Sequence, residues 1–169
     1  AVNPSITVDK THFAEMYERQ MLMLDSLTPH QAHKLKECVA EGETTLSRDT
    51  HIRAPAGAGK TFLALHLMLQ TLRGDRSVCV LFVAQNAALA SFVCRWFYTR
   101  VSRGGGGGVG KESKGAGIWG RLHVLCGSGL DKHQNVSITD SKLSLEAIEG
   151  EDVSYSLLVV DEAHHLYCQ

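Results

Sequence analysis

Four side chains of this 169-residue sequence have the types and the spacing that phosphate chemistry requires. Lys60 and Thr61 close a glycine-containing run, and Asp161 and Glu162 follow a short apolar run near the other end of the chain. A lysine ammonium neutralises phosphate oxygens, and threonine and aspartate oxygens are ligands for Mg²⁺. A glutamate can orient and deprotonate an attacking water. These residues predict a site that binds a nucleotide with Mg²⁺ and hydrolyses it.

The glycine-containing run, Ala54–Thr61, fits the GxxxxGK[ST] pattern of a phosphate-binding loop, with Ala54 where the first glycine usually stands. Glycines let the backbone curl until several N–H groups point into one hollow, and the following helix adds its own unpaired N–H groups. A glycine-rich turn that merely precedes a helix is the alternative. The predicted nucleotide-binding residues of the loop are Pro55, Ala56, Gly57, Ala58, Gly59, Lys60 and Thr61.

The elements that must position these residues can be predicted from hydrophobic patterns. Apolar runs predict strands at Val78–Ala84, Leu122–Cys126 and Leu157–Val160, and a further strand is expected over Thr50–Arg53, directly before the loop. Helices are expected over Phe62–Leu72, over Ala87–Arg100, from Pro29 to a stop near Gly42, and, as one short helix, over Ser141–Ile148. This alternation predicts an α/β fold with a parallel sheet flanked by helices. Asp161 and Glu162 then lie at the carboxyl edge of the sheet, where such folds bind ligands.

Two further segments have a distinct composition. Residues 11–24 place Phe13, Met16, Tyr17, Met21 and Leu24 on one face of an amphipathic helix, which we expect to pack on the flank of the domain. Residues 103–120 are rich in glycine and predict a flexible surface insertion. The aromatic residues between 87 and 100 are interpreted as core, with a base-stacking platform as the alternative. His66 is interpreted as a core histidine.

The overall composition limits the classes of function. A net charge of −1 gives no global attraction to nucleic acid or to membranes, so any basic surface must be local. The five cysteines are far apart, and no pair has the spacing of metal ligands or of a disulfide framework. No secretory signal is recognisable, and no apolar run approaches the roughly 20 residues of a membrane span. We therefore expect no membrane partner and an intracellular protein, nuclear or cytoplasmic.

A glutamine upstream of the loop suggests which base is bound. Leu27-Thr28-Pro29-His30-Gln31 begins a helix, with Thr28 as a cap and Pro29 in the first turn. The amide of Gln31 carries a donor and an acceptor in a fork, which matches the N6–H and N7 edge of adenine. A solvated helix residue is the alternative interpretation of Gln31.

Together these motifs resemble the first RecA-like motor domain of superfamily 1 helicases and of related helicase-like P-loop ATPases, the Schlafen-type group included. Residues 27–31 resemble the adenine-reading glutamine motif, Ala54–Thr61 resembles Walker A, and Asp161-Glu162-Ala163-His164 resembles Walker B in its DEAH form. Residues 82–89, with Gln85-Asn86, resemble the motif that lies along single-stranded nucleic acid. The resemblance implies ATP and Mg²⁺ as ligands: Lys60 on phosphate, Thr61 and Asp161 on Mg²⁺, Glu162 as the catalytic carboxylate, and His164 in coupling.

The resemblance spans most of residues 27–169, preceded by the amphipathic helix within residues 1–26, and the sequence ends eight residues after Asp161. The later strands of such a domain and a second RecA-like domain lie outside it. We therefore expect an incomplete RecA-like domain with little activity of its own, as a fragment of a longer protein or a degenerate copy. A signalling or assembly switch ATPase and a non-catalytic binding module remain alternatives to the DNA or RNA helicase motor.

Overall fold

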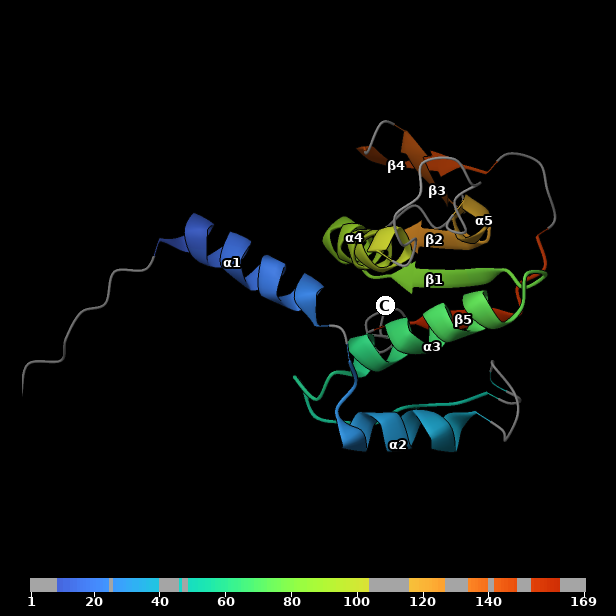
Figure 1. The fold of residues 1–169 in the computed structure, drawn as a ribbon, viewed down its shortest axis with the longest axis horizontal. Coiled ribbons are helices and arrows are strands. Elements are labelled where there is room, and N and C mark those ends of the chain that lie inside the picture. The colour runs from blue at the N-terminus through green and yellow to red at the C-terminus, as the bar shows by residue number, and fades with distance from the viewer. Residues whose placement is uncertain are drawn as a thin grey trace, which may run out of the picture.

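The computed structural model of the protein describes residues 9–24, 26–39, 46, 49–103, 116–126, 134–139, 142–148 and 153–161. Within these ranges the chain forms both helices and strands, with three helices before the first strand and four consecutive strands at the end (Figure 1). The elements in chain order are α1 (Lys10–Met23), α2 (Pro29–Cys38), α3 (Lys60–Gly74), β1 (Val80–Ala84), α4 (Ala87–Arg103), α5 (Ala116–Trp119), β2 (Leu122–Cys126), β3 (Gln134–Thr139), β4 (Lys142–Ala147) and β5 (Leu157–Val160).

The five described strands form one sheet in the order β4-β3-β2-β1-β5. β1 pairs in parallel with β2 on one side and with β5 on the other, so that Val80 lies opposite both Leu122 and Leu157. The prediction of an α/β fold with a parallel sheet flanked by helices is confirmed, as are the three apolar strands. Because β1 and β5 run in the same direction, the residues that follow Ala84 and Val160 meet at one edge of the sheet.

The core is built from α3, α4 and the parallel strands. All five residues of β1 are buried, as expected for a strand covered on both faces. Trp96 and Phe97 on α4 are completely buried, and the Trp96 ring lies edge-on to Phe62 of α3 with 6.0 Å between the ring centres. The interpretation of these aromatic residues as core is therefore confirmed. His66 is half-buried and lies edge-on to Phe62, with 4.7 Å between the ring centres.

The short helix predicted over Ser141–Ile148 is wrong, because Lys142–Ala147 form strand β4. This strand pairs in antiparallel fashion with β3, from Gln134 opposite Ala147 to Thr139 opposite Lys142. The sequence Lys-Leu-Ser-Leu-Glu-Ala alternates apolar and polar residues, which suits a strand. Backbone pairing along a whole hairpin therefore outweighs the weak helical preference of these residues.

The strand predicted over Thr50–Arg53 is also wrong, since residues 49–55 have no regular secondary structure. A strand needs a paired neighbour, and within the described sheet the only strand paired with β5 is β1. Two predicted boundaries shift as well. Helix α2 ends at Cys38 rather than near Gly42, and α4 continues to Arg103.

The glycine-rich segment 103–120 differs in part from the predicted surface insertion. Arg103 is the last residue of α4, and Ala116–Trp119 form the short helix α5. Ile118 of α5 is buried, so this end of the segment belongs to the domain. Residues 104–115 lie outside the described residues. The predicted flexibility therefore does not apply to residues 116–120.

Helix α1 forms as predicted but is only partly packed. It projects from the rest of the molecule and approaches α4 along one side (Figure 1). Met16, Tyr17 and Leu24, three residues of its predicted apolar face, are exposed, so these side chains are not part of the buried core. Leu22 packs against the core. Among the described residues, no helix has the length and apolarity needed to span a membrane.

Candidate functional site

The loop between Ala54 and α3 has the backbone conformation that its glycines allow. Gly57 and Gly59 have φ values of 77° and 85°, in the left-handed region that other residues rarely adopt. The amide of Ala58 donates to the carbonyl of Pro55 at 3.2 Å, which tightens the turn. Gly59 is the N-cap of α3, and no side chain caps its first N–H groups. Such a helix start favours an anion, because the N–H groups and the positive end of the helix dipole face it.

The side chain of Lys60 folds back over this loop. Its ammonium donates to the carbonyl oxygens of Ala54 at 2.9 Å and Pro55 at 3.2 Å. These two bonds hold the positive charge at the mouth of the loop rather than out in solvent. An anion that enters the loop would meet a cation already in place, since the ammonium has a third donor to offer.

Thr61 and Asp161 lie 100 residues apart in sequence, and their side chains touch. The Thr61 hydroxyl donates to the Asp161 carboxylate at 2.6 Å. Thr61 belongs to the first turn of α3, and Asp161 directly follows β5 at the carboxyl edge of the sheet. Asp161 is buried, so its carboxylate is oriented by the surrounding fold. This pair presents two oxygen ligands of the kind that Mg²⁺ prefers.

Gln31 also reaches the loop, from the start of α2. Its side-chain amide donates to the Ala58 carbonyl at 3.2 Å, while its side-chain oxygen accepts the Thr28 backbone N–H at 3.0 Å. The Thr28 hydroxyl accepts the Gln31 backbone N–H at 3.2 Å, which completes a capping box. Gln31 therefore caps α2 and bonds to the loop, a structural role that neither interpretation of the sequence included. The Thr-x-x-Gln spacing was the signal that could have revealed it.

The approach of Gln31 adds a second constraint at Gly59, whose positive φ already favours glycine. A Cβ atom at Gly59 would lie 2.3 Å from the side-chain nitrogen of Gln31, which is closer than real contacts allow. At Gly57 a Cβ atom would meet nothing within 4 Å. The two glycines thus serve different purposes, because only Gly59 leaves room for the neighbouring helix. The bonds and this close fit bring together Gln31, the loop, Lys60, Thr61 and Asp161.

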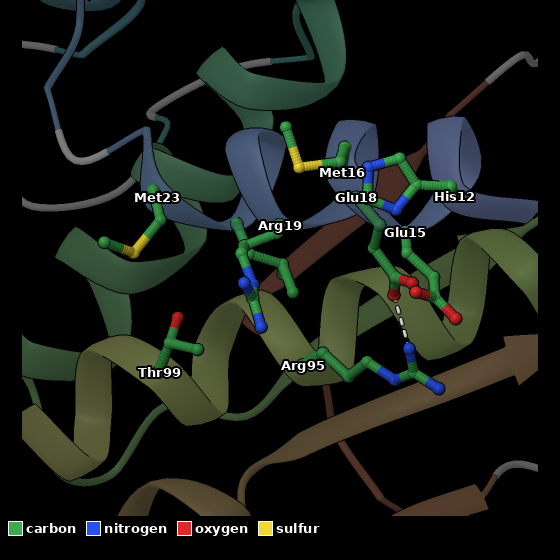
Figure 2. Close-up of a pocket in the computed structure, with 9 residues that line it drawn as sticks. His12, Glu15, Met16, Glu18, Arg19, Met23, Arg95 and Thr99 are labelled. Carbon is green, nitrogen blue, oxygen red and sulfur yellow. Dashed lines mark hydrogen bonds and ion pairs between the residues drawn. The ribbon is translucent and has the colours of Figure 1, made fainter.

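A groove of about 400 Å³ opens beside these residues. It lies between residues 50–54 and β5, and both Lys60 and Asp161 line it. A larger cavity of about 610 Å³ lies between α1 and α4 and is lined by His12, Glu15, Met16, Glu18, Arg19, Leu22, Met23, Arg95 and Thr99 (Figure 2). No residue of the loop lines that cavity, so the smaller groove is the one that belongs to the candidate site.

The other predicted site residues either lie outside the described residues or form contacts of a different kind at this edge. Glu162 and His164 lie outside the described residues. Asn86 caps α4, since its side-chain oxygen accepts the Leu89 backbone N–H at 2.9 Å, and Gln85 is exposed beside it. In the part of the chain that the structure describes, no three His, Cys, Asp or Glu side chains gather as a metal cage. The four described cysteines, Cys38, Cys79, Cys94 and Cys126, are free thiols.

Comparison with known proteins gives one match. A family model described as type III restriction enzyme, res subunit, matches residues 24–169. No curated protein and no solved structure matches the chain. The matched range contains the capping box, the loop and Asp161, and it begins at the last residue of the turn that ends α1.

Proposed function

The chain belongs to the family of the type III restriction enzyme res subunit, a family of helicase-like, RecA-like P-loop ATPase domains, and we propose that it binds ATP with Mg²⁺ and hydrolyses it as part of a DNA or RNA helicase motor. The observation that carries the proposal is the 2.6 Å hydrogen bond between Thr61 and Asp161. It joins the end of the phosphate-binding loop to the carboxyl edge of the sheet. A loop that served only as a turn would not need a hydrogen bond to this buried carboxylate.

The proposed roles follow from the positions of the side chains. The loop backbone from Pro55 to Thr61 would surround the phosphates, and Lys60 would turn from the loop carbonyls to the β- and γ-phosphate oxygens. Gln31 would read adenine with the donor and acceptor capacity that its two hydrogen bonds leave unused. The side-chain amide has a second N–H, and its oxygen has a second lone pair.

The same residues fit a magnesium ion. Thr61 and Asp161 would hold Mg²⁺, which requires few protein ligands because phosphate oxygens and water complete its shell. When bound, Mg²⁺ would neutralise charge on the phosphates. The Asp161 carboxylate would then lose the hydrogen bond from the Thr61 hydroxyl and turn one of its oxygens towards the ion. Glu162, which follows directly in the sequence, would orient the attacking water and accept its proton.

Titration of the protein with ATP tests the proposal. Lys60→Ala removes the positive charge over the loop and should weaken ATP binding by about tenfold or more, because charge-assisted bonds to phosphate are among the strong ones. Arg76→Ala is the matched control, since Arg76 is an exposed cation just beyond the other end of α3. Equal affinities for all three proteins would show that the loop does not bind phosphate.

The nucleic-acid partner is tested by measuring the ATPase rates of the same proteins. We propose that single-stranded DNA or RNA raises the ATPase rate, as a helicase motor requires, and that Lys60→Ala abolishes the stimulated rate. An ATPase rate that nucleic acid leaves unchanged would favour a switch ATPase that assembles with other proteins. ATP binding without any hydrolysis would favour a non-catalytic binding module.

A further inference from the structure

An arginine remote from the loop holds the end of α1. Arg100 of α4 is only 9% exposed, and a charge in such a place must be well hydrogen-bonded to be tolerated. Its guanidinium donates to the Leu22 carbonyl at 3.0 Å and also to the Leu24 carbonyl. These carbonyls lie where α1 ends, and helix carbonyls there have no partner within their own helix. Arg100 therefore acts as a C-terminal cap that comes from a different helix.

The guanidinium rests on Trp96, a residue of its own helix α4 that contacts the helix carrying the loop. It lies 3.8 Å from the centre of the Trp96 ring, the distance of a cation–π contact. Trp96 in turn contacts α3 edge-on, through Phe62 at 6.0 Å and His66 at 5.3 Å. Phe62 directly follows Thr61 in the sequence. The end of α1 is thus connected to the first turns of α3 through Arg100 and Trp96.

The chain held by Arg100 leads directly to Gln31. Thr28 lies four residues beyond Leu24, and its backbone N–H fixes the side-chain oxygen of Gln31. The other half of the Gln31 amide is fixed by the Ala58 carbonyl of the loop. The direction of the Gln31 fork therefore depends on the position of Thr28 relative to the loop. Thr28 is the N-cap of α2, which contacts α3, and it follows the end of α1, to which Arg100 is bonded.

We propose that Arg100 is a positioning residue for base selection: by clamping the end of α1 onto Trp96, it sets Thr28 and thereby the orientation in which Gln31 meets the base. The inference rests on the proposed function, because it takes Gln31 as the adenine-reading group. Lysine cannot replace Arg100 in this role. Its single ammonium cannot bond two separated carbonyls and also lie flat on an indole ring.

The experiment compares the affinities of ATP, GTP and inorganic tripolyphosphate for four proteins. These are the wild type, Arg100→Lys, Gln31→Ala and the double variant Gln31→Ala with Arg100→Lys. We expect the wild type to prefer ATP to GTP, and Arg100→Lys to lower this preference by about tenfold, the discrimination that one two-point base contact provides. Tripolyphosphate, which has no base, should bind the wild type and Arg100→Lys equally. The double variant should show no further loss beyond Gln31→Ala, since both changes remove the same interaction.

Arg95→Lys is the matched control. Arg95 lies on α4 and forms an ion pair with Glu18 of α1, so the change alters the same helix pair without touching Leu24 (Figure 2). Its ATP preference should equal that of the wild type. The inference is overturned if Arg100→Lys keeps the full ATP preference. It is overturned equally if ATP, GTP and tripolyphosphate all weaken by the same factor, because that is the result of a general structural role.

Hydrogen exchange on the wild type provides a test that does not depend on a variant. ATP should slow exchange of the backbone amides near Thr28 and at the end of α1 more than tripolyphosphate does, and equal protection by the two ligands would overturn the inference. If Arg100→Lys does not fold, Arg100→Gln keeps an uncharged donor and serves in its place. The two proposals fail in different ways. A wild type that binds tripolyphosphate no better than Lys60→Ala contradicts the proposed function, whereas an ATP preference that survives loss of Arg100 contradicts only the inference.

Discussion

At the scale of single residues, the candidate site depends on contacts between side chains and the loop that cannot be inferred from the motif. The GxxxxGK[ST] pattern correctly locates the loop, and the left-handed conformations of Gly57 and Gly59 agree with it. The pattern does not reveal that Gly59 also leaves space for Gln31. Nor does it reveal that Lys60 is held by the carbonyls of Ala54 and Pro55. Such contacts arise from segments that only the fold brings together.

Gly59→Ala should damage the site more than Gly57→Ala. Both changes force an L-residue into a left-handed conformation, at a cost of about 1–2 kcal/mol each in the free energy of unfolding. Only the new Cβ atom at position 59 collides with the side-chain nitrogen of Gln31. Urea unfolding should therefore show a larger loss for Gly59→Ala, and ATP titration a larger loss of affinity. Equal losses of stability and affinity in the two variants would mean that the contact with Gln31 is unimportant.

At the scale of elements, hydrophobic runs predict strands and helices well where burial decides the conformation. β1, β2, α3 and α4 follow from such runs because neighbours cover them, and β5 follows from its run as well, although Leu158 in it is exposed. β4 and the segment 50–53 do not, since the first depends on pairing with β3 and the second lacks a paired neighbour within the described sheet. A local apolar run does not show which segments pair as neighbouring strands.

The start of α4 offers a test at this scale. Asn86 accepts the Leu89 N–H, so Asn86→Ala should lower the free energy of unfolding by about 1 kcal/mol, the usual effect of losing an N-cap. Asn86→Asp should retain the cap, and Gln85→Ala should change stability little because Gln85 is exposed. Thermal unfolding of the three variants measures this. A loss for Gln85→Ala as large as that for Asn86→Ala would contradict the assignment of Asn86 as the cap.

Cys94, a buried residue of α4, should make the free energy of unfolding depend on pH. Burial raises the pKa of the Cys94 thiol from 9.0 to about 12. The folded protein therefore binds this proton more tightly than the unfolded chain does, and the resulting stability is complete below pH 9.0 and is lost as pH rises towards about 12. Between about pH 8 and about pH 10.5, the loss attributable to Cys94 should be about 2 kcal/mol.

Urea unfolding at these two pH values, in the wild type and in Cys94→Ala, isolates this contribution. The variant is expected to be less stable at both values, because it leaves a cavity, but its stability should fall less with rising pH. Ser91→Ala, which alters a partly buried side chain of α4 that does not ionise, should retain the pH dependence of the wild type. A pH dependence that Cys94→Ala leaves unchanged would contradict this assignment.

At the scale of the whole molecule, the site is assembled from segments near both ends of the described chain. The parallel pairing of β1 with β5 brings Asp161 to the edge where α3 begins, and α2 brings Gln31 to the opposite side of the loop. The sequence was sufficient to predict the loop, the carboxylate and the sheet edge on which they meet, because each has a local signature. It was not sufficient to predict the contact of Gln31 with the Ala58 carbonyl or the clamp at Arg100, because these depend on how α1 and α2 sit on the domain.

We propose that Thr61 and Asp161 hold Mg²⁺ for a nucleotide in the loop, and ATP affinity with and without Mg²⁺ tests this assignment directly. Mg²⁺ should tighten ATP binding in the wild type by about tenfold or more, the size of effect that even outer-shell changes at a metal site have on metal affinity. The tightening should persist in Thr61→Ser, which keeps the hydroxyl, and disappear in Thr61→Val and Asp161→Asn. The same Mg²⁺ dependence in all four proteins would contradict the assignment of these two residues as Mg²⁺ ligands.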